Sequence, residues 1–404
     1  MKKERSKAKA IDAAKMTVTM PLQKQKHKLD QATIAAHEME ALSIDDSALP
    51  FPPSALDPDF SSGVNTSRAT PVASDSETEA SDTRPQDLLL ELVSTPDRGQ
   101  ALFTTRKVKA GTLLLSEQPL ISLDKDEEDD PDAIERGFSR LRRSEQKAYL
   151  KLFDAQKSRM TRVVSIYYSN CYNCDAFKAD GRGGSAIGAL ASRINHSCVP
   201  NVQFCYNEGT NEMEFRAVRD IPGGKEVYSN YDKAVFEVKT KRRRKQQIYY
   251  GFVCKCEACE PKNEFWARSD ERRKGMYEAF RVLQSCDEKF SEKGDGPAGG
   301  EGRQNAAVVN EALDALARLE ELLLKECQVG IPLANAYRSM AKWAERKHDF
   351  KQAAKWKIKE LEVCMTCFGP SARRVKEIQE KVANLDNVSG EPSSQHAVSL
   401  SSQS

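Results

Sequence analysis

Four cysteines in the middle of the chain constrain the fold more than any other feature. Cys254, Cys256 and Cys259 form a C-x-C-x-x-C array, and Cys198 lies far upstream in residues 193–201 (RINHSCVPN). Together they offer four thiolate ligands, the number that a closed, tetrahedral structural zinc site requires. The pattern therefore indicates a clasp between two segments that are distant in the sequence.

The length and charge of the chain set outer limits on its organisation. A chain of 404 residues has room for two domains and a substantial core. Because 30% of the residues are charged and the mean hydropathy is −0.63, we expect part of the chain to remain in water. The 62 basic and 60 acidic residues leave a net charge of +2, so no global imbalance predicts a nucleic-acid or membrane partner.

The cysteine content predicts a reducing compartment. Eleven cysteines are an odd number, several have metal-like spacings, and we find no secretory signal or long apolar run. We therefore expect an intracellular protein of the nucleus, the cytoplasm or both. Residues 1–5 (MKKER) are basic and read as a nuclear signal or a transit peptide, but Glu4 and the acidic residues from Glu38 onward argue against the latter.

Short apolar runs predict a β-rich unit in two separated blocks. The first block contains residues 88–93, 101–103 and 112–115, which are punctuated by Pro and Gly. In the second, apolar and polar residues alternate over residues 202–206 and 213–217. Between the blocks, a helical insert is predicted by apolar residues at approximately helical spacing: Ile134, Phe138, Leu141, Tyr149, Leu152 and Phe153.

The last third of the chain is predicted to be helical. Ala312, Leu316, Leu319 and Leu323 share one helix face, and a helical hairpin is expected to turn at residues 348–350. The hairpin is similar to a tetratricopeptide pair. We expect this region to be a packing domain that covers the β-rich core, and the alternative is a dedicated surface for a protein partner.

At its cysteine motifs the sequence resembles the SET-domain lysine methyltransferases, on the branch of the SET and MYND proteins and related fungal SET proteins. The resemblance covers residues 88–260 and implies that Cys198, Cys254, Cys256 and Cys259 bind a structural zinc ion. It also implies S-adenosylmethionine as the methyl donor. Residues 122–168 contain no cysteine, so the MYND zinc finger is missing.

The resemblance assigns donor contacts to several short motifs. Arg98-Gly99-Gln100-Ala101-Leu102 is similar to the G-x-G-L turn of the family, with Ala101 in place of the second glycine, and residues 169–172 resemble its T-N-A-F segment. Phe252 matches the aromatic residue beside the adenine. The resulting donor-binding set is Gly99, Ala101, Leu102, Asn170, Arg193, Asn195, His196, Tyr231 and Phe252.

Residues 226–231 (EVYSNY) resemble the family's strand that ends in Ser-Tyr, with Asn230 where a serine is usual. We therefore predict that Tyr231 is the catalytic tyrosine and that Tyr250 borders the lysine channel. A tyrosine suits this task because its ring face favours a cationic nitrogen and its hydroxyl orients the amine. The alternative for Tyr231 is an aromatic residue packed in the core of a strand.

Two other features admit several interpretations. Cys171 and Cys174 form a C-x-x-C pair that is compatible with a second metal or a redox pair, but we expect coincidental cysteines, as for Cys364 and Cys367. The basic residues 239–245 could be a nuclear signal, a contact for an acidic substrate or a solvated helix face, and we expect the last.

These observations predict an α+β protein that methylates a lysine of a histone or another protein. A protein partner of the C-terminal helices is an additional expectation, with no membrane and no direct nucleic-acid contact. The alternative is a catalytically inactive, zinc-stabilised interaction module, which Ala101 and Asn230 favour. The predicted regions are a disordered tail (1–86), a SET domain (87–235) with its helical insert (about 124–168), a post-SET zinc segment (236–262), a helical domain (263–386) and a second disordered tail (387–404).

Overall fold

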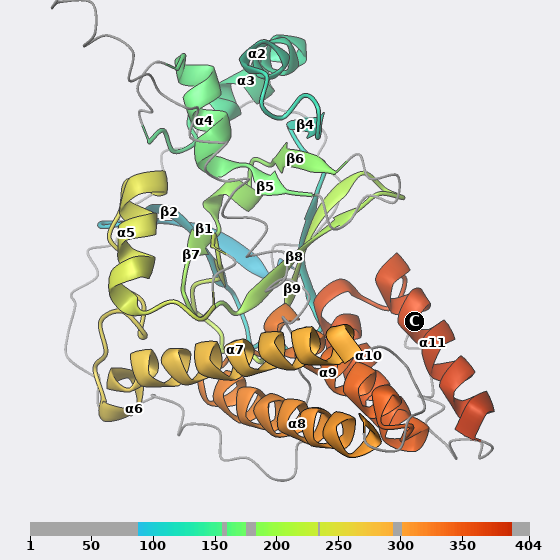
Figure 1. The fold of residues 1–404 in the computed structure, drawn as a ribbon. Coiled ribbons are helices and arrows are strands. Elements are labelled where there is room, and N and C mark those ends of the chain that lie inside the picture. Colours follow the sequence, from blue (N-terminus) through green and yellow to red (C-terminus); the bar gives the residue numbers. More distant parts are fainter. Residues whose placement is uncertain (1–87, 156–159, 175–182, 233–234, 294–300, 390–404) are drawn as a thin grey trace, which may run out of the picture.

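The computed structural model describes residues 88–155, 160–174, 183–232, 235–293 and 301–389. Within these residues, small β-sheets combine with two groups of helices, one inserted between strands and one C-terminal (Figure 1). The α+β class predicted from the sequence is confirmed. The tail predicted over residues 1–86 lies outside the described residues.

The strands pair across the insert, so the two β-rich blocks form one core. β3 pairs antiparallel with β9, which also pairs with β8, while β4 pairs with β6 and β6 with β5. β1 and β2 form a hairpin, and β7 and β10 run parallel. The strands are β1 (Leu90–Thr95), β2 (Gly99–Thr104), β3 (Leu113–Glu117), β4 (Ile121–Asp124), β5 (Tyr172–Asn173), β6 (Gly184–Ile187), β7 (Asn195–His196), β8 (Val202–Asn207), β9 (Glu212–Ala217) and β10 (Tyr228–Ser229).

The insert is helical, as its apolar spacing predicts. Asp130 caps its first helix by accepting from the backbone N–H of Asp132 at 2.9 Å, and Pro131 occupies a first-turn position that needs no N–H donor. Ile134 and Tyr149 are buried in a cluster that also contains residues of β4 and β6. The helices are α2 (Pro131–Arg140), α3 (Arg143–Tyr149) and α4 (Arg162–Asn170).

The C-terminal region forms a layer of helices on the opposite side of the sheets from α2–α4 (Figure 1). The hairpin turns where the sequence predicts, and the side chain of Asp349 caps its second helix by accepting from the N–H of Gln352 at 3.0 Å. The helices after the β-rich core are α5 (Lys239–Tyr250), α6 (Glu264–Ala267), α7 (Ser269–Lys293), α8 (Glu301–Lys325), α9 (Ile331–Arg346), α10 (Phe350–Phe368) and α11 (Arg373–Ser389).

Helix α11 extends through Ser389, whereas the sequence predicts a disordered tail from residue 387. Val375 and Ile378 in its first turns are buried against the other helices, which stabilises the start of this helix. Residues 390–404 lie outside the described residues.

The helical layer packs directly on the β8–β9 sheet. Val202, Phe204 and Tyr206 point into the β-rich core, whereas Cys205, between them, belongs to the hydrophobic cluster of the helices. Helix α10 makes the contact with β8 and β9. Strand β8 is therefore buried on both faces at Cys205, a position that the alternating pattern of the sequence treats as polar.

No helix in the described part of the chain is both long and apolar enough to cross a membrane.

Replacement of Gly184 by alanine should destabilise the core strongly. Gly184 has a φ of +124°, and a Cβ there would lie 2.2 Å from the carbonyl oxygen of Leu123 in the paired strand β4. We expect the free energy of unfolding to fall by at least about 2 kcal/mol in urea denaturation followed by circular dichroism. Gly224→Ala is the control because its φ is +70° with no atom within 4 Å of the added Cβ, so backbone strain alone should cost about 1 kcal/mol. Equal losses would contradict the steric argument.

Candidate functional site

Four thiols from two distant segments meet at one point. The Sγ atom of Cys198 lies 3.9 Å from that of Cys254 and 3.6 Å from that of Cys259. With Cys256, all four sulfur atoms lie within 4.8 Å of one another. Tetrahedral zinc with Zn–S bonds of about 2.3 Å separates its sulfur ligands by about 3.8 Å. The four cysteines, which we call the thiol clasp, therefore fit a zinc ion.

The other cysteine pairs have different surroundings. Cys174, Cys364 and Cys367 are buried. Burial raises the pKa of the Cys364 thiol to about 12, and burial also raises that of Cys367. Because the thiolate is the reactive form, Cys364 and Cys367 are poor nucleophiles at neutral pH.

Arg242 corrects the prediction that residues 239–245 form a solvated helix face. Its side chain is only 3% exposed, and its Nη2 atom donates to the carbonyl oxygen of Ala258 at 3.1 Å. The same atom lies 3.6 Å from Sγ of Cys259. Helix α5 thus directs one basic residue at the thiol clasp. A guanidinium in this position offsets the negative charge of thiolates, which explains why a charged side chain is buried here.

Aromatic rings gather beside the thiol clasp. The ring of Tyr231 has its centroid 5.3 Å from that of His196, 5.1 Å from that of Tyr250 and 6.3 Å from that of Phe252. These residues come from β7, from the segment after β10 and from the end of α5. Tyr250 and Phe252 precede Cys254 closely in the chain, so the thiol clasp determines where their rings lie.

The Tyr231 hydroxyl is a hydrogen-bond donor and not a base. It donates to the carbonyl oxygen of Ile194 at 2.8 Å, and burial raises the pKa of Tyr231 well above its usual value. The hydroxyl therefore keeps its proton at neutral pH, and its oxygen retains lone pairs for a second partner. Tyr250 donates to the backbone carbonyl of Tyr231 at 3.2 Å and thereby orients the neighbouring ring.

His196 connects the aromatic rings to the thiol clasp. Its Nδ1 atom accepts from the backbone N–H of Tyr231 at 3.2 Å, so its proton resides on Nε2, which lies 3.4 Å from Sγ of Cys198. Burial lowers the pKa of His196 to about 4, which keeps the ring neutral at pH 7. His196 therefore fixes the position of Tyr231 relative to Cys198.

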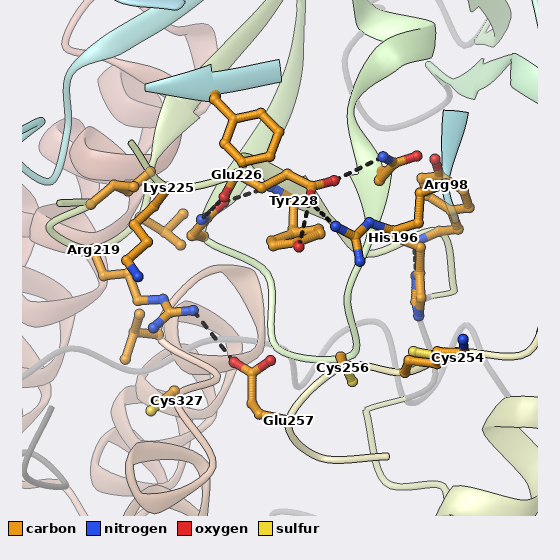
Figure 2. Close-up of a pocket in the computed structure, with 18 of the residues that line it drawn as sticks. Arg98, His196, Arg219, Lys225, Glu226, Tyr228, Cys254, Cys256, Glu257 and Cys327 are labelled. Carbon is orange, nitrogen blue, oxygen red and sulfur yellow. Dashed lines mark hydrogen bonds and ion pairs between the residues drawn. The ribbon is translucent and has the colours of Figure 1, made fainter. Parts of the chain in front are cut away.

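Glu226 is the polar centre of the site and was missed by the sequence reasoning. Its carboxylate accepts from Asn195 Nδ2 at 2.8 Å, from Arg98 Nη2 at 2.8 Å and from the Tyr228 hydroxyl at 2.7 Å (Figure 2). The side chain is 4% exposed. One signal in the sequence could have indicated this role of Glu226: its carboxylate precedes Val227 at the start of an apolar strand. A charge buried there needs a partner, because an unpaired buried charge is costly.

These groups line one elongated cavity of about 2340 Å³ that extends from the β1–β2 turn past the thiol clasp to the C-terminal helices. Figure 2 shows Arg98, His196 and Glu226 in one part of it and Arg219, Glu257 and Cys327 in another. The cavity brings together most of the predicted site residues: Gly99, Asn170, Arg193, Asn195, His196, Tyr231, Tyr250, Phe252, Cys254 and Cys256.

Two residues of the predicted donor-binding set lie elsewhere. Ala101 is 0% and Leu102 2% exposed, and the Leu102 side chain packs in the β-rich core. At the cavity wall, Asn170 donates to the carbonyl oxygens of Phe153 and Ile166, each at 2.7 Å, so its amide nitrogen serves the local backbone. Nearby, Arg193 donates to the carbonyl oxygen of Lys151 at 3.0 Å.

Comparison with known proteins finds similarity in the part of the chain around this cavity. A family model described as "SET domain" matches residues 99–232. The sequence is 31% identical to histone-lysine N-methyltransferase set5 of Schizosaccharomyces pombe over 189 residues. These residues make up 46% of this chain and 56% of that protein. It is 33% identical to N-lysine methyltransferase SMYD2 of Homo sapiens over 105 residues. This aligned stretch is 25% of this chain and 24% of that protein.

The matched region is thus about half of the set5 protein and a quarter of SMYD2. Among solved structures, the crystal structure of the SET domain of LSMT bound to lysine and AdoHcy covers 74% of this chain and 89% of that chain, at 10% identity and a TM-score of 0.28. That score is too low to support an argument about shared geometry. The resemblance to SET-domain lysine methyltransferases predicted from the sequence is confirmed by the family model and the sequence relatives.

Cys256→Ser should remove zinc from the protein. The hydroxyl of serine is a poor zinc ligand compared with a thiolate, and structural zinc contributes on the order of 10 kcal/mol to local folding. We expect about one zinc per chain in the wild type by atomic emission, and far less zinc with a lower melting temperature in the variant. Cys171→Ser, a change outside the thiol clasp, should retain the metal. A variant at Cys256 that still holds one zinc per chain would refute this ligand set.

Proposed function

We propose that this protein, in which residues 99–232 form a SET domain, transfers a methyl group from S-adenosylmethionine to a lysine side chain of another protein. The observation that carries the proposal is the junction of the thiol clasp with the rings of His196, Tyr231, Tyr250 and Phe252. Such a junction supplies an aromatic-lined cavity next to polar groups that can hold a charged small molecule.

The donor would occupy the part of the cavity between Gly99, Asn195 and Phe252. When bound, S-adenosylmethionine supplies the methyl group and a positive sulfonium. Gly99 has a φ of +70° with no atom within 4 Å of a built Cβ, so its backbone is open to close approach. Asn195, oriented by Glu226, would hold the amino acid end, and the Phe252 ring would lie beside the adenine.

The remaining donor contacts follow from the family resemblance and from the cavity lining. Arg193 and Asn170 would border the donor at the cavity wall. Ala101 and Leu102 would serve the donor site indirectly, through the strand β2 that also carries Gly99, since both residues are buried and neither lines the cavity. An alanine in place of the usual glycine therefore has no side chain in the cavity, which favours a working donor site over a relic.

The acceptor lysine would enter between Tyr231 and Tyr250. A free lysine has a pKa of about 10.4, so forming the neutral amine at pH 7 costs about 5 kcal/mol. Removal from water and a nearby positive sulfonium both lower that pKa. The ring faces attract the cationic nitrogen before deprotonation, and the Tyr231 oxygen, fixed by Ile194, aligns the amine for in-line attack.

The zinc ion would be structural, since four thiolates leave no open coordination position. We propose a protein substrate with a target lysine, in a histone or another protein, because the relatives are named histone-lysine and N-lysine methyltransferases.

The location follows from the substrate. If the substrate is a histone, the protein would act on chromatin in the nucleus; if it is another protein, it would act in the cytoplasm as well. A protein partner on the C-terminal helices belongs to the same proposal.

Calorimetric titration of the zinc-loaded protein with S-adenosylmethionine tests this proposal directly. We expect binding with a Kd in the micromolar range, since the cavity offers aromatic and polar groups for both ends of the donor. A bound donor would justify a screen of histones and cell extract for methylated lysines. No binding would favour the alternative, an inactive interaction module.

Tyr231→Phe should slow methyl transfer at least about a hundredfold and leave the Kd for S-adenosylmethionine within about threefold, because only the hydroxyl that orients the amine is lost. Single-turnover methylation of the identified substrate measures the first quantity and calorimetry the second. Tyr149→Phe is the matched control and should keep wild-type turnover, since its hydroxyl also donates to a backbone carbonyl, that of Val163 at 2.8 Å, but away from the cavity. Unchanged turnover in Tyr231→Phe would remove this residue from its proposed role.

A further inference from the structure

The C-terminal helices contact the backbone of the thiol clasp from outside the SET domain. The carbonyl oxygen of Cys198 accepts two hydrogen bonds, from Arg273 Nη2 on α7 and from Gln328 Nε2 after α8, each at 2.9 Å. Arg273 is 1% and Gln328 2% exposed. A buried carbonyl with two side-chain donors from one distant region has its position set by that region.

The same guanidinium reaches a second segment of the site. Nη1 of Arg273 donates to the carbonyl oxygen of Val235 at 2.6 Å. Cys198 follows His196 closely in the chain, and Val235 follows Tyr231. Because the guanidinium is planar and rigid, one side chain sets the spacing between the segments that carry His196 and Tyr231.

A buried carboxylate anchors Arg273. Glu326, which is 0% exposed, accepts from Arg273 Nε at 2.8 Å and from Arg272 Nε at 2.7 Å, and the Ser269 hydroxyl bonds to the same carboxylate. A buried ion cluster is seldom more stabilising than apolar residues of similar volume. The visible consequence of this cluster is the geometry that it imposes on the Cys198 and Val235 carbonyls.

The turn after α8 places Gln328 against the Cys198 carbonyl and Glu326 against Arg273. Cys327 between them has a φ of 53°, in the left-handed region that a non-glycine residue seldom adopts. The N–H groups of Cys327 and Gln328 close the helix end by donating to Leu324 at 3.0 Å and Leu323 at 2.9 Å. This turn directs the polar side chains on either side of Cys327 inward.

We propose that Arg273 and Gln328 are positioning residues through which the C-terminal helices hold the zinc ligand Cys198 in place. The helical region is then part of the scaffold of the donor site and not only a cover for the β-sheet. This inference rests on the zinc site of the proposed function. It requires no catalytic turnover, so zinc retention can test it without a substrate.

The test compares the rate at which the full-length, zinc-loaded protein releases zinc to an excess of a chromogenic chelator. Arg273→Lys keeps the positive charge beside Glu326 but loses the two Nη donors that bind the Cys198 and Val235 carbonyls. Gln328→Leu removes the amide donor to the Cys198 carbonyl and leaves no buried charge unpaired. Each should release zinc about tenfold faster, the factor expected for the loss of one buried hydrogen bond. Each should also weaken binding of S-adenosylmethionine.

Arg338→Lys is the matched control. Arg338 Nε donates to the buried Glu360 at 2.8 Å, as Arg273 Nε donates to Glu326, but this bond lies within the α9–α10 hairpin. It should lower the melting temperature less, because the Arg338 side chain is 34% exposed and that of Arg273 only 1%, and it should release zinc at the wild-type rate. Wild-type release rates in both Arg273→Lys and Gln328→Leu would overturn the inference, as would equal acceleration in the control. A wild-type protein without zinc would overturn the zinc clasp of the proposed function as well.

Discussion

The rest of the site depends on the meeting of four thiols from two distant segments. Cys198 follows β7, and Cys254, Cys256 and Cys259 follow α5, so a metal at this point ties the end of α5 to the β-rich core. Tyr250 and Phe252 lie in the tied segment. This tie and the hydrogen bond from the Tyr250 hydroxyl to the Tyr231 carbonyl bring their rings to His196 and Tyr231, which no local preference of the sequence would do.

Buried charge organises the surroundings of the thiol clasp. Glu226 gathers Arg98, Asn195 and Tyr228 on the cavity side, and Glu326 gathers two arginines on the helical side. Removal of a charge from water is costly, so each carboxylate determines the positions of the donors around it. The Glu326 cluster connects the helical layer to the Cys198 and Val235 carbonyls through Arg273, whereas the Glu226 cluster joins separate segments within the β-rich part.

The helical layer shares a hydrophobic interface with the SET domain as well as polar contacts. Strand β8 presents Cys205 to α10 and its other apolar side chains to the β-rich core, so one strand belongs to two hydrophobic clusters. Interfaces of this kind resemble the interior of a domain more than a contact between domains that move freely. The cavity, whose wall includes residues of both parts, is consequently a joint product of the SET domain and the helices.

Local patterns in the sequence determined the α+β class, the two β-rich blocks, the helical insert and the turn at Asp349, because spacing and capping act within a few residues. The cysteine motif likewise predicted the segments that meet. Only the tertiary structure decided that Arg242 is buried and that Glu226 and Arg273 organise the site. A charged residue in a polar run looks solvated in the sequence, since its burial is created by partners that are remote in the chain and become neighbours only when the fold closes.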